Sequence, residues 1–174
     1  MEIKLTDTEI REAASKGMEA FVSVFVHAIS DAAGGEITAQ AMEKLTSEQL
    51  TLWGYWVMRE EVMEGGFIQL IHNGWGPFFF ENPFARALKL WGLRDLSKLV
   101  YEARRLYLEH GEVLTSDCSD EEFMALYEQF PDFDPLDDDF VEHEEEYTEA
   151  IARHIDAAPE AFVTIVNTND DSEE

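Results

Sequence analysis

The chain has 174 residues and a formal net charge of −26 at pH 7, because 38 Asp and Glu residues face only 12 Lys and Arg residues. Its hydrophobic content of 45% is that of a globular protein with a sizeable core and not that of a disordered chain. The charge argues against direct binding to nucleic acid or to anionic membranes, whose phosphates repel it, and favours a basic partner, a cation or a high-salt environment.

The single cysteine and the N-terminal segment indicate a cytoplasmic protein. Cys118 has no second cysteine with which to form a disulfide bond. The segment MEIKLTDTEI lacks the basic and apolar regions of a signal peptide, and the apolar run at residues 20–29 is too short to span a bilayer. We therefore expect a soluble protein of the cytoplasm.

Helix-start signals and helical spacing of apolar residues dominate the chain. Capping boxes begin at Thr6 and Ser119, and a related start signal begins at Thr46. The β-branched run near Val24 also suits a strand, but no turn signal interrupts it before Gly34, so a helix is preferred. The predicted helices cover residues 6–33, 38–45, 46–73 with an interruption at Gly65–Gly66, 82–91 with Asn82 as cap, 95–110 ended by Gly111, 119–130 and 137–157.

Residues 74–83 are predicted to form an aromatic loop, and no segment is a confident strand. The sequence thus predicts an all-α fold, a single compact domain of about seven helices over residues 1–166. The acidic residues 167–174 are predicted to be a disordered tail.

The negative charge is concentrated in the last third of the chain. Residues 1–108 contain 15 acidic residues and 11 Lys or Arg, whereas residues 109–174 contain 23 acidic residues and only Arg153. Residues 132–149 alone contain ten acids, together with apolar residues near helical spacing: Phe133, Leu136, Phe140, Val141 and Tyr147. A disordered tail needs no such residues, so this stretch is predicted to be a folded helix with one buried stripe and an acidic face.

Metal binding and catalysis have little support in the sequence. The segment starting at Asp132 does not match the EF-hand loop pattern, because its fifth position is Leu136 and its sixth is Asp137 instead of glycine. The histidines do not form a two-His or Glu-x-x-His metal motif, and Cys118 at a helix start is predicted to be structural. No catalytic residue, metal or cofactor is predicted. A divalent-cation-binding or enzymatic helical domain, whose acids serve solubility, remains the alternative.

The dense carboxylates themselves suggest an imitation of DNA. On a helix, carboxylates three or four residues apart lie about 5–6 Å apart. B-DNA presents a phosphate every 3.4 Å or so of its axis along each strand. A solvated acidic face and adaptation to high salt are the alternatives, but adaptation to salt would spread acids over the whole chain, and residues 1–108 are nearly balanced. An inhibitor of a basic enzyme such as a nuclease would share the same electrostatics.

Four segments resemble a bacterial family. They are the Gly-Gly-Phe-x-Gln motif at residues 65–69 within residues 60–74, and the segments at residues 87–93, 134–140 and 151–162. Over residues 45–163 the chain resembles an all-helical family, long classed as a domain of unknown function, whose named member is an acidic bacterial DNA-mimic protein. Glu64 stands where this family usually has Asn. The motif is interpreted as structural: Gly65 and Gly66 allow close packing, and Gln69 and Asn73 satisfy backbone groups.

The resemblance implies binding and not catalysis. The named member of the family acts as a dimer and sequesters a helix-turn-helix transcription regulator from its operator, with carboxylates that imitate DNA phosphates. By this resemblance we expect a homodimer that occupies the DNA-binding face of a basic protein, either a transcription regulator or a nucleoid protein. The residues expected to contact that partner are Asp132, Asp134, Asp137, Asp138, Asp139, Glu142, Glu144, Glu145, Glu146 and Glu149, supported by Glu121, Glu122 and Glu128.

Overall fold

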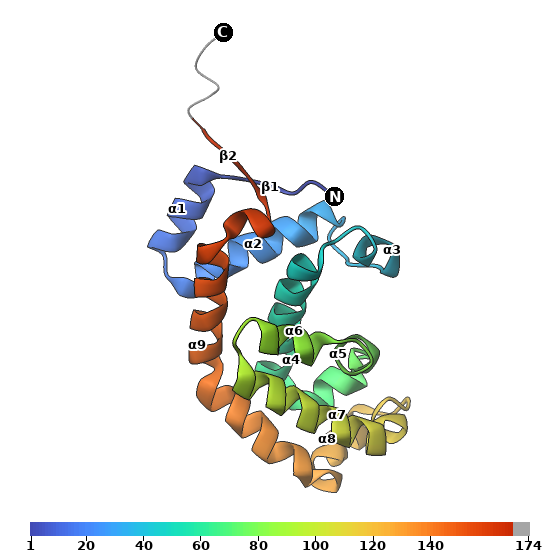
Figure 1. Ribbon diagram of the computed structural model, residues 1–174. Coiled ribbons are helices and arrows are strands. Elements are labelled where there is room, and N and C mark those ends of the chain that lie inside the picture. Colours follow the sequence, from blue (N-terminus) through green and yellow to red (C-terminus); the bar gives the residue numbers. More distant parts are fainter. Residues whose placement is uncertain (169–174) are drawn as a thin grey trace. The chain divides into compact units, whose positions relative to one another are not determined.

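Nine α-helices account for most of residues 1–168, which are the residues described in the computed structural model (Figure 1). The helices are α1 (Asp7–Ser15), α2 (Met18–Ala32), α3 (Ala39–Met42), α4 (Ser47–His72), α5 (Gly76–Phe80), α6 (Phe84–Leu90), α7 (Arg94–Leu114), α8 (Asp120–Gln129) and α9 (Asp134–Ala157). Seven of them are at least seven residues long, which confirms the predicted all-α fold. None of the helices in this part of the chain is long and apolar enough to cross a membrane.

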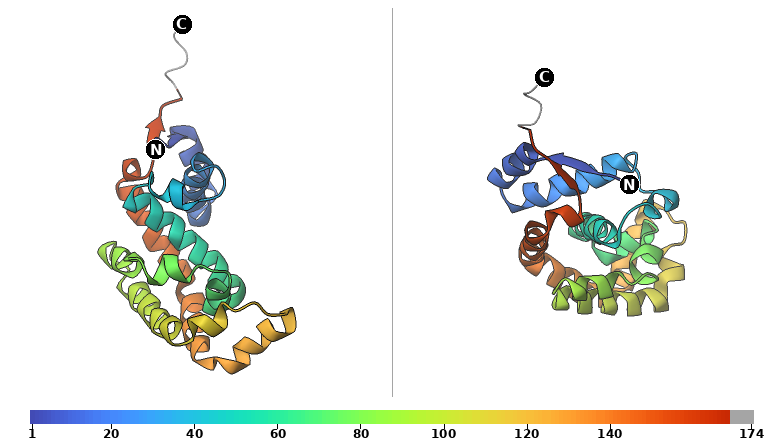
Figure 2. Two further views of the ribbon diagram at one scale, coloured as in Figure 1. Left: turned by 90° about the vertical axis from the view of Figure 1, so that its right-hand side faces the viewer. Right: turned by 45° about the horizontal axis from the view of Figure 1, so that its top comes forward.

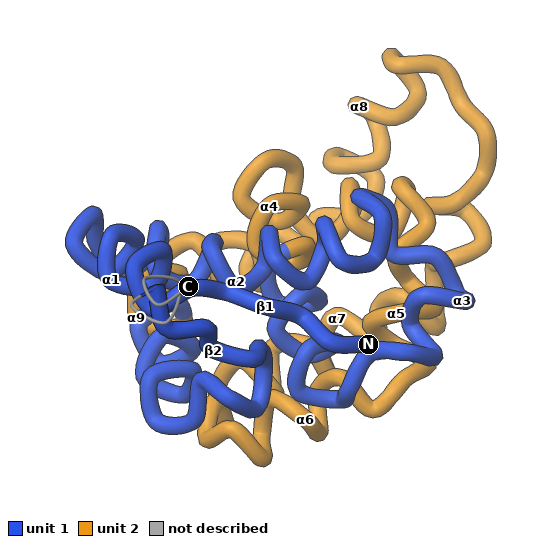
Figure 3. The backbone as a smooth tube through the Cα atoms, turned by 90° about the horizontal axis from the view of Figure 1, so that it is seen from above, with its two compact units in different colours: residues 1–56, 148–174 blue, residues 57–147 orange. Residues whose placement is uncertain are grey.

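The described residues separate into two compact units (Figure 3). The first unit contains Met1–Trp56 and the chain from Thr148 onward, and the second contains Val57–Tyr147. The unit boundaries fall within α4 and α9, so both helices contribute residues to each unit. The extent of the predicted domain, residues 1–166, remains a prediction. Of the predicted tail, residues 169–174 lie outside the described part, whereas the backbone N–H of Thr168 donates a hydrogen bond to Asp7 at 3.1 Å.

The first predicted helix is in fact two helices, α1 and α2. Its start is as expected, because Thr6 and Glu9 form the capping box of α1. The chain then turns at Gly17, whose φ of 117° lies in a region that other residues rarely adopt. The apolar periodicity continues through this glycine, which is why the sequence pattern does not reveal the break.

The first unit is built around α2 and the segment that follows α9. Phe25 of α2 is fully buried, and its ring packs edge-on against Phe162 with the centroids 6.4 Å apart. The Phe162 carbonyl accepts a hydrogen bond of 2.8 Å from the buried Gln49 side chain. The strands β1 (Lys4–Thr6) and β2 (Thr164–Val166) pair in parallel next to it, with Leu5 opposite Ile165 (Figure 2). Three-residue strands are too short to show a two-residue period, so this pairing was not predicted.

In the second unit, the predicted aromatic loop contains the helix α5. Phe79 of this helix is buried, and its ring packs against Phe84 of α6 with the centroids 5.0 Å apart. The prediction that Asn82 caps α6 is wrong. Its side-chain amide instead donates to the carbonyls of Pro77 and Phe78 in α5. An Asn between two helices can serve either one, and here it serves the preceding helix.

The prediction that Gly111 ends helix α7 is wrong, because the helix continues to Leu114. Gly111 lies against the ring of Tyr107, which would be 3.0 Å from an added Cβ atom. The glycine therefore allows close packing against Tyr107 and does not form a turn. At the end of the helix, the Leu114 carbonyl lies 2.8 Å from Nδ1 of His72, which connects α7 to the end of α4.

Candidate functional site

The predicted acidic helix is anchored on one side. Phe133, in the 3-10 helix η1 (Pro131–Phe133) that joins α8 to α9, is fully buried, as is Phe140 of α9. Tyr147 is also buried, which confirms that three of the predicted apolar positions face the interior. Leu136 is half-buried, and Val141, with 51% of its surface exposed, does not belong to the buried stripe.

Ten of the thirteen predicted partner-contacting acids are exposed: Glu121, Glu122, Glu128, Asp132, Asp134, Asp138, Glu142, Glu145, Glu146 and Glu149. All of them except Glu149 belong to the second unit, on α8, η1 and the first turns of α9, whose connection can be followed in Figure 2. The exposed acids differ in how far they are engaged within the protein. Glu122 completes the capping box of α8 with Ser119, as predicted, and Glu149 forms an ion pair with Arg153.

We define the acidic stripe as the four α9 residues Asp134, Asp138, Glu142 and Glu145. They follow each other at intervals of four, four and three residues, so they lie along one face of the helix. All four are exposed, and within residues 1–168 none of them forms an ion pair. The acidic stripe therefore presents unneutralised charge to solvent.

Two predicted surface acids, Asp137 and Glu144, face inward. Glu144 is buried and forms an ion pair with Arg59 of α4, with 10% and 15% of the two side chains exposed. Asp137 is half-buried against Gly66. Asp137 precedes the buried Phe140 by three residues and Glu144 follows it by four, so helical geometry places all three on the same face. This spacing was visible in the sequence. Asp139, a third predicted contact, is half-buried beside His143.

Asp137 holds a break in helix α4. Gly65 and Gly66 have non-helical backbone angles, with φ of 72° at Gly66, so the helical bonding pattern is interrupted there as predicted. The backbone N–H of Phe67, which begins the next helical segment, donates to Oδ1 of Asp137 at 2.8 Å. The Gly65 carbonyl accepts a hydrogen bond of 2.7 Å from the hydroxyl of Tyr127 in α8. A Cβ atom on Gly66 would overlap the Asp137 carboxylate, so glycine is required.

The other residues of the family motif form a polar network around Glu61. Its carboxylate accepts hydrogen bonds from the side chains of Gln69 at 3.0 Å, Asn73 at 2.9 Å and Trp75 at 3.2 Å. Glu64, the residue that departs from the family pattern, also accepts a bond from Gln69 at 3.1 Å. The prediction that Gln69 and Asn73 satisfy backbone groups is therefore wrong, because both side chains bind carboxylates. The network connects the segments on either side of the break, so the motif is structural.

The surroundings change the proton affinity of two groups on α9. Burial, together with the negative charges of Asp134 and Asp138, raises the pKa of Asp137 to about 6, although the bond from Phe67 opposes this change. His143 has a raised pKa, mainly because the Asp139 carbonyl accepts its hydrogen bond and also because neighbouring carboxylates stabilise the imidazolium. The raised pKa of Asp137 is thus a consequence of packing this carboxylate against α4.

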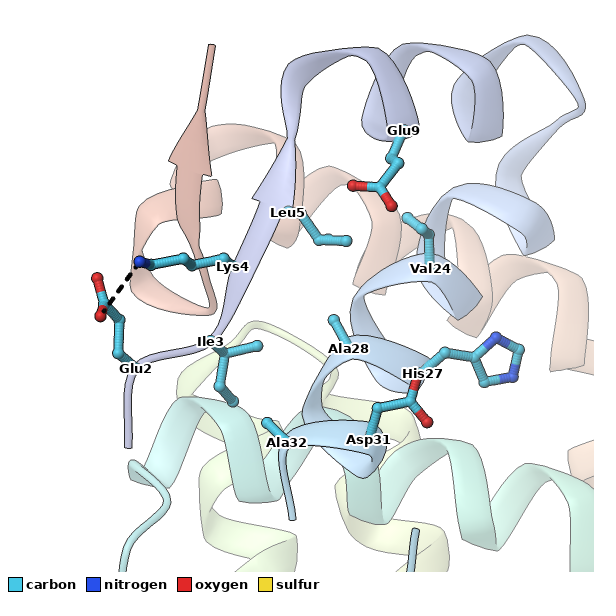
Figure 4. Close-up of a pocket in the computed structure, with 10 residues that line it drawn as sticks. All are labelled: Glu2, Ile3, Lys4, Leu5, Glu9, Val24, His27, Ala28, Asp31 and Ala32. Atoms are coloured by element: carbon cyan, nitrogen blue, oxygen red, sulfur yellow. Dashed lines mark ion pairs between the residues drawn. The ribbon is translucent and has the colours of Figure 1, made fainter. Parts of the chain in front are cut away.

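Within the described residues, no group of three or more His, Cys, Asp or Glu side chains is arranged to hold a metal ion. A hollow in the first unit lies between β1 and α2 (Figure 4). Its apolar walls include Ile3 and Val24, while Lys4 pairs with Glu2 at 3.6 Å. Glu9 at its edge is occupied in the cap of α1. Three charged side chains of this hollow, Glu2, Lys4 and Glu9, are thus used locally, and the acidic surface is the stronger candidate.

Comparison with known proteins identifies similar sequences. A family model described as DMP19-like protein matches residues 43–158, which include the break in α4 and all thirteen predicted acids. A protein of Neisseria meningitidis serogroup B (strain ATCC BAA-335 / MC58), named DNA mimic protein DMP19, is 32% identical over 127 residues. The aligned region covers 72% of this chain and 77% of that relative.

Stability is expected to increase on mild acidification. The folded-state pKa of Asp137, about 6, lies above its ordinary value of 3.8, so its contribution to stability is complete below pH 3.8 and is lost as the pH rises through 6. Between pH 7 and pH 5 the free energy of unfolding should rise by about 1 kcal/mol from this group. His143 acts in the same direction, whereas the lowered pKa values of Asp7 and Glu9 reduce stability only when the pH falls towards 4 or below.

Urea unfolding of wild type and Asp137→Asn at pH 7, 6 and 5 measures this effect. The Asn side chain can still accept the bond from Phe67 but carries no charge, so the variant should lose this part of the pH dependence and be more stable at pH 7. Asp138→Asn, which removes an exposed charge next to Asp137, is the control and should keep most of the pH dependence. Equal pH dependence in wild type and Asp137→Asn would refute the assignment.

Proposed function

The chain belongs to the DMP19-like protein family, as the resemblance of its Gly-Gly-Phe-x-Gln segment implied, and we propose that it is a DNA mimic that sequesters a basic DNA-binding protein. The observation that carries the proposal is the acidic stripe, a row of exposed, unpaired carboxylates on an anchored helix. The name of the Neisseria relative supports the same function. The proposed role is binding in the cytoplasm and not catalysis.

The spacing of the acidic stripe suits a surface that normally contacts phosphates. Successive side chains of the stripe lie about 5–6 Å apart, as expected for residues three or four apart on a helix. Proteins that bind DNA contact its phosphates mainly with Lys and Arg side chains and backbone N–H groups. Such a protein, for example a helix-turn-helix transcription regulator or a nucleoid protein, could bind the stripe because its carboxylates have the same charge sign as DNA phosphates and a comparable spacing. The acids of α8 and η1 extend this surface.

The mechanism that we propose is electrostatic. The net charge of −26 attracts a basic protein over long distances and accelerates encounter at low salt. Binding neutralises charge on both partners, so the affinity should fall as salt screens the interaction. Once bound, the partner's basic surface is covered and cannot engage DNA.

A matched pair of triple variants tests which carboxylates bind the partner. The first neutralises three residues of the acidic stripe, as Asp138→Asn, Glu142→Gln and Glu145→Gln. The second neutralises three exposed acids of the first unit, as Glu12→Gln, Glu36→Gln and Glu43→Gln. Both change the net charge by the same amount, but only the first removes charge from the stripe.

Basic proteins captured at low salt by the immobilised wild-type chain are identified, and their affinities are measured by titration calorimetry. The stripe variant should bind roughly tenfold more weakly because it lacks local contacts, and the control should change little. Equal loss of affinity in both variants would show that only net charge matters and would contradict a specific mimic surface.

We also propose that the protein is a homodimer. Exposed apolar side chains on α7 support this proposal, since 49% of Tyr101 and 62% of Leu108 are exposed. These residues are seven positions apart and lie on one face of the helix. Two large exposed apolar side chains on one face of a helix could contribute contacts to an interface between two copies of the chain.

Light scattering after size-exclusion chromatography should give a mass near twice the 19.9 kDa of one chain. Leu108→Glu should shift the protein towards the monomer, because it places a charge in the apolar contact. Leu90→Glu, at a residue of α6 that is 77% exposed, is the matched control and should remain dimeric. A wild-type mass of one chain at micromolar concentration would contradict the dimer.

A further inference from the structure

A groove with a volume of about 520 Å³ lies between α7 and α9 in the second unit. Part of its wall is apolar and consists of Leu99, Pro135 and Leu136. Four carboxylates line the same groove, namely Asp95 and Glu102 from α7 and Asp139 and Glu146 from α9, and they outnumber the two basic side chains there, Lys98 and His143. The groove thus combines a surface for an alkyl chain with a surface for a positive charge.

The carboxylates of the groove are not equally available to a ligand. Asp139 interacts with His143 at 3.2 Å, and Glu102 forms an ion pair with Arg105 at 3.3 Å. Asp95 lies 3.8 Å from Lys98, whose side chain is 80% exposed. Glu146 is exposed and forms no ion pair within residues 1–168. It is therefore the carboxylate best placed to bind a cation from outside.

Tyr147 provides an independent sign of a ligand site in this groove. Only 8% of its surface is exposed, yet its hydroxyl forms no hydrogen bond with any residue in the described part of the chain. No fully buried side-chain polar atom there lacks a partner, so the Tyr147 hydroxyl must open onto the groove that the residue lines. A buried tyrosine hydroxyl usually finds a hydrogen-bond partner, and here residues 1–168 supply none.

The hydroxyl stays neutral under all physiological conditions. Burial is the main reason that the pKa of Tyr147 rises to about 12, and the negative charges of Asp139, Asp95 and Glu146 add to it. A neutral hydroxyl oxygen accepts a hydrogen bond from an N–H group. The same carboxylates that raise the pKa make the neighbourhood of the hydroxyl favourable for a cation.

We propose that this groove binds an arginine side chain of the basic partner, with its alkyl stem against Leu99 and Leu136 and its guanidinium group between Glu146 and the Tyr147 hydroxyl. Arginine fits better than lysine because its planar guanidinium offers five N–H donors in fixed directions, which a carboxylate and a hydroxyl can share. The choice of occupant rests on the proposed function. The acidic stripe attracts a basic surface, and the groove adds directional contacts that select one arginine on it.

The proposal is tested on the full chain with two peptides. The probe is acetyl-Gly-Arg-Gly-amide, and the control is the same peptide with citrulline, which has nearly the same shape but no charge. Binding is followed by NMR of the aromatic ring signals, including that of Tyr147. The arginine peptide should shift the Tyr147 signal with saturation, and the citrulline peptide should bind at least about fivefold more weakly, because a charged partner strengthens a hydrogen bond to a carboxylate.

Two pairs of variants assign the contact. Glu146→Gln and Tyr147→Phe should each weaken binding of the arginine peptide by roughly threefold to tenfold, since each removes one hydrogen-bonding group. The controls Glu12→Gln, at an exposed acid of the first unit, and Tyr101→Phe, exposed on α7, should stay within twofold of wild type. Tyr147→Phe keeps the ring and removes a hydroxyl that has no partner within residues 1–168, so the fold should be retained, which circular dichroism verifies.

Three results would overturn the proposal: equal binding of the arginine and citrulline peptides, equal affinity in groove and control variants, or binding of free agmatine at least tenfold tighter than the peptide. The last result would assign the groove to a small cationic metabolite. None of these measurements uses the captured protein partner. Their failure would therefore leave the role of the acidic stripe intact, and failure of the stripe variants would leave peptide binding in the groove unaffected.

Discussion

The break in helix α4 at Gly65 and Gly66 is the constraint on which the acidic surface of the second unit depends. At this break, two backbone groups form hydrogen bonds with side chains of two other helices. Tyr127 of α8 donates to the Gly65 carbonyl, and Asp137 of α9 accepts from the Phe67 N–H. Because buried backbone groups must be paired, these bonds fix the two acidic helices to the same point of the core. The family motif thus acts as a structural support for acids that lie outside it.

The anchoring outweighs the repulsion among the exposed carboxylates. Like charges three or four residues apart on a helix destabilise it by about 0.2–0.5 kcal/mol per pair. The acidic stripe contains three such neighbouring pairs. Burial of a large apolar side chain contributes about 1.5–3 kcal/mol, and Phe133, Phe140 and Tyr147 are all buried. The ion pair between Glu144 and Arg59 adds a further attachment to α4. A dense charge array can therefore remain ordered, which a charged tail could not achieve.

Features set by neighbouring residues were predictable from the sequence, and features set by distant ones were not. The capping boxes at Thr6 and Ser119 and the break at Gly65 depend on a few adjacent residues, and each is found where it was predicted. The pairing of β1 with β2 joins residues 160 positions apart, so no local pattern announces it. Asn82 lies between two helices, and only packing decides which helix it caps.

The candidate site shows the same division. Helical spacing predicted the buried positions Phe140 and Tyr147, and the same spacing applied to Asp137 and Glu144 would have placed them inside. The inward orientation of these two acids was not predicted, because every acid in the dense acidic run was assigned to the exposed face. The groove beside Tyr147 could not be predicted at all, since its walls come from two helices that the sequence does not place together.

The most direct measurement is a competition between this protein and duplex DNA for one captured basic protein, followed by fluorescence anisotropy of labelled DNA. A DNA mimic covers the surface that contacts phosphates, so the protein should release the DNA completely, with an affinity that falls steeply as salt is raised. The apparent affinity of the protein should decrease in proportion to the DNA concentration, as simple competition requires. Formation of a stable complex that contains the partner, the DNA and this protein together would contradict the account.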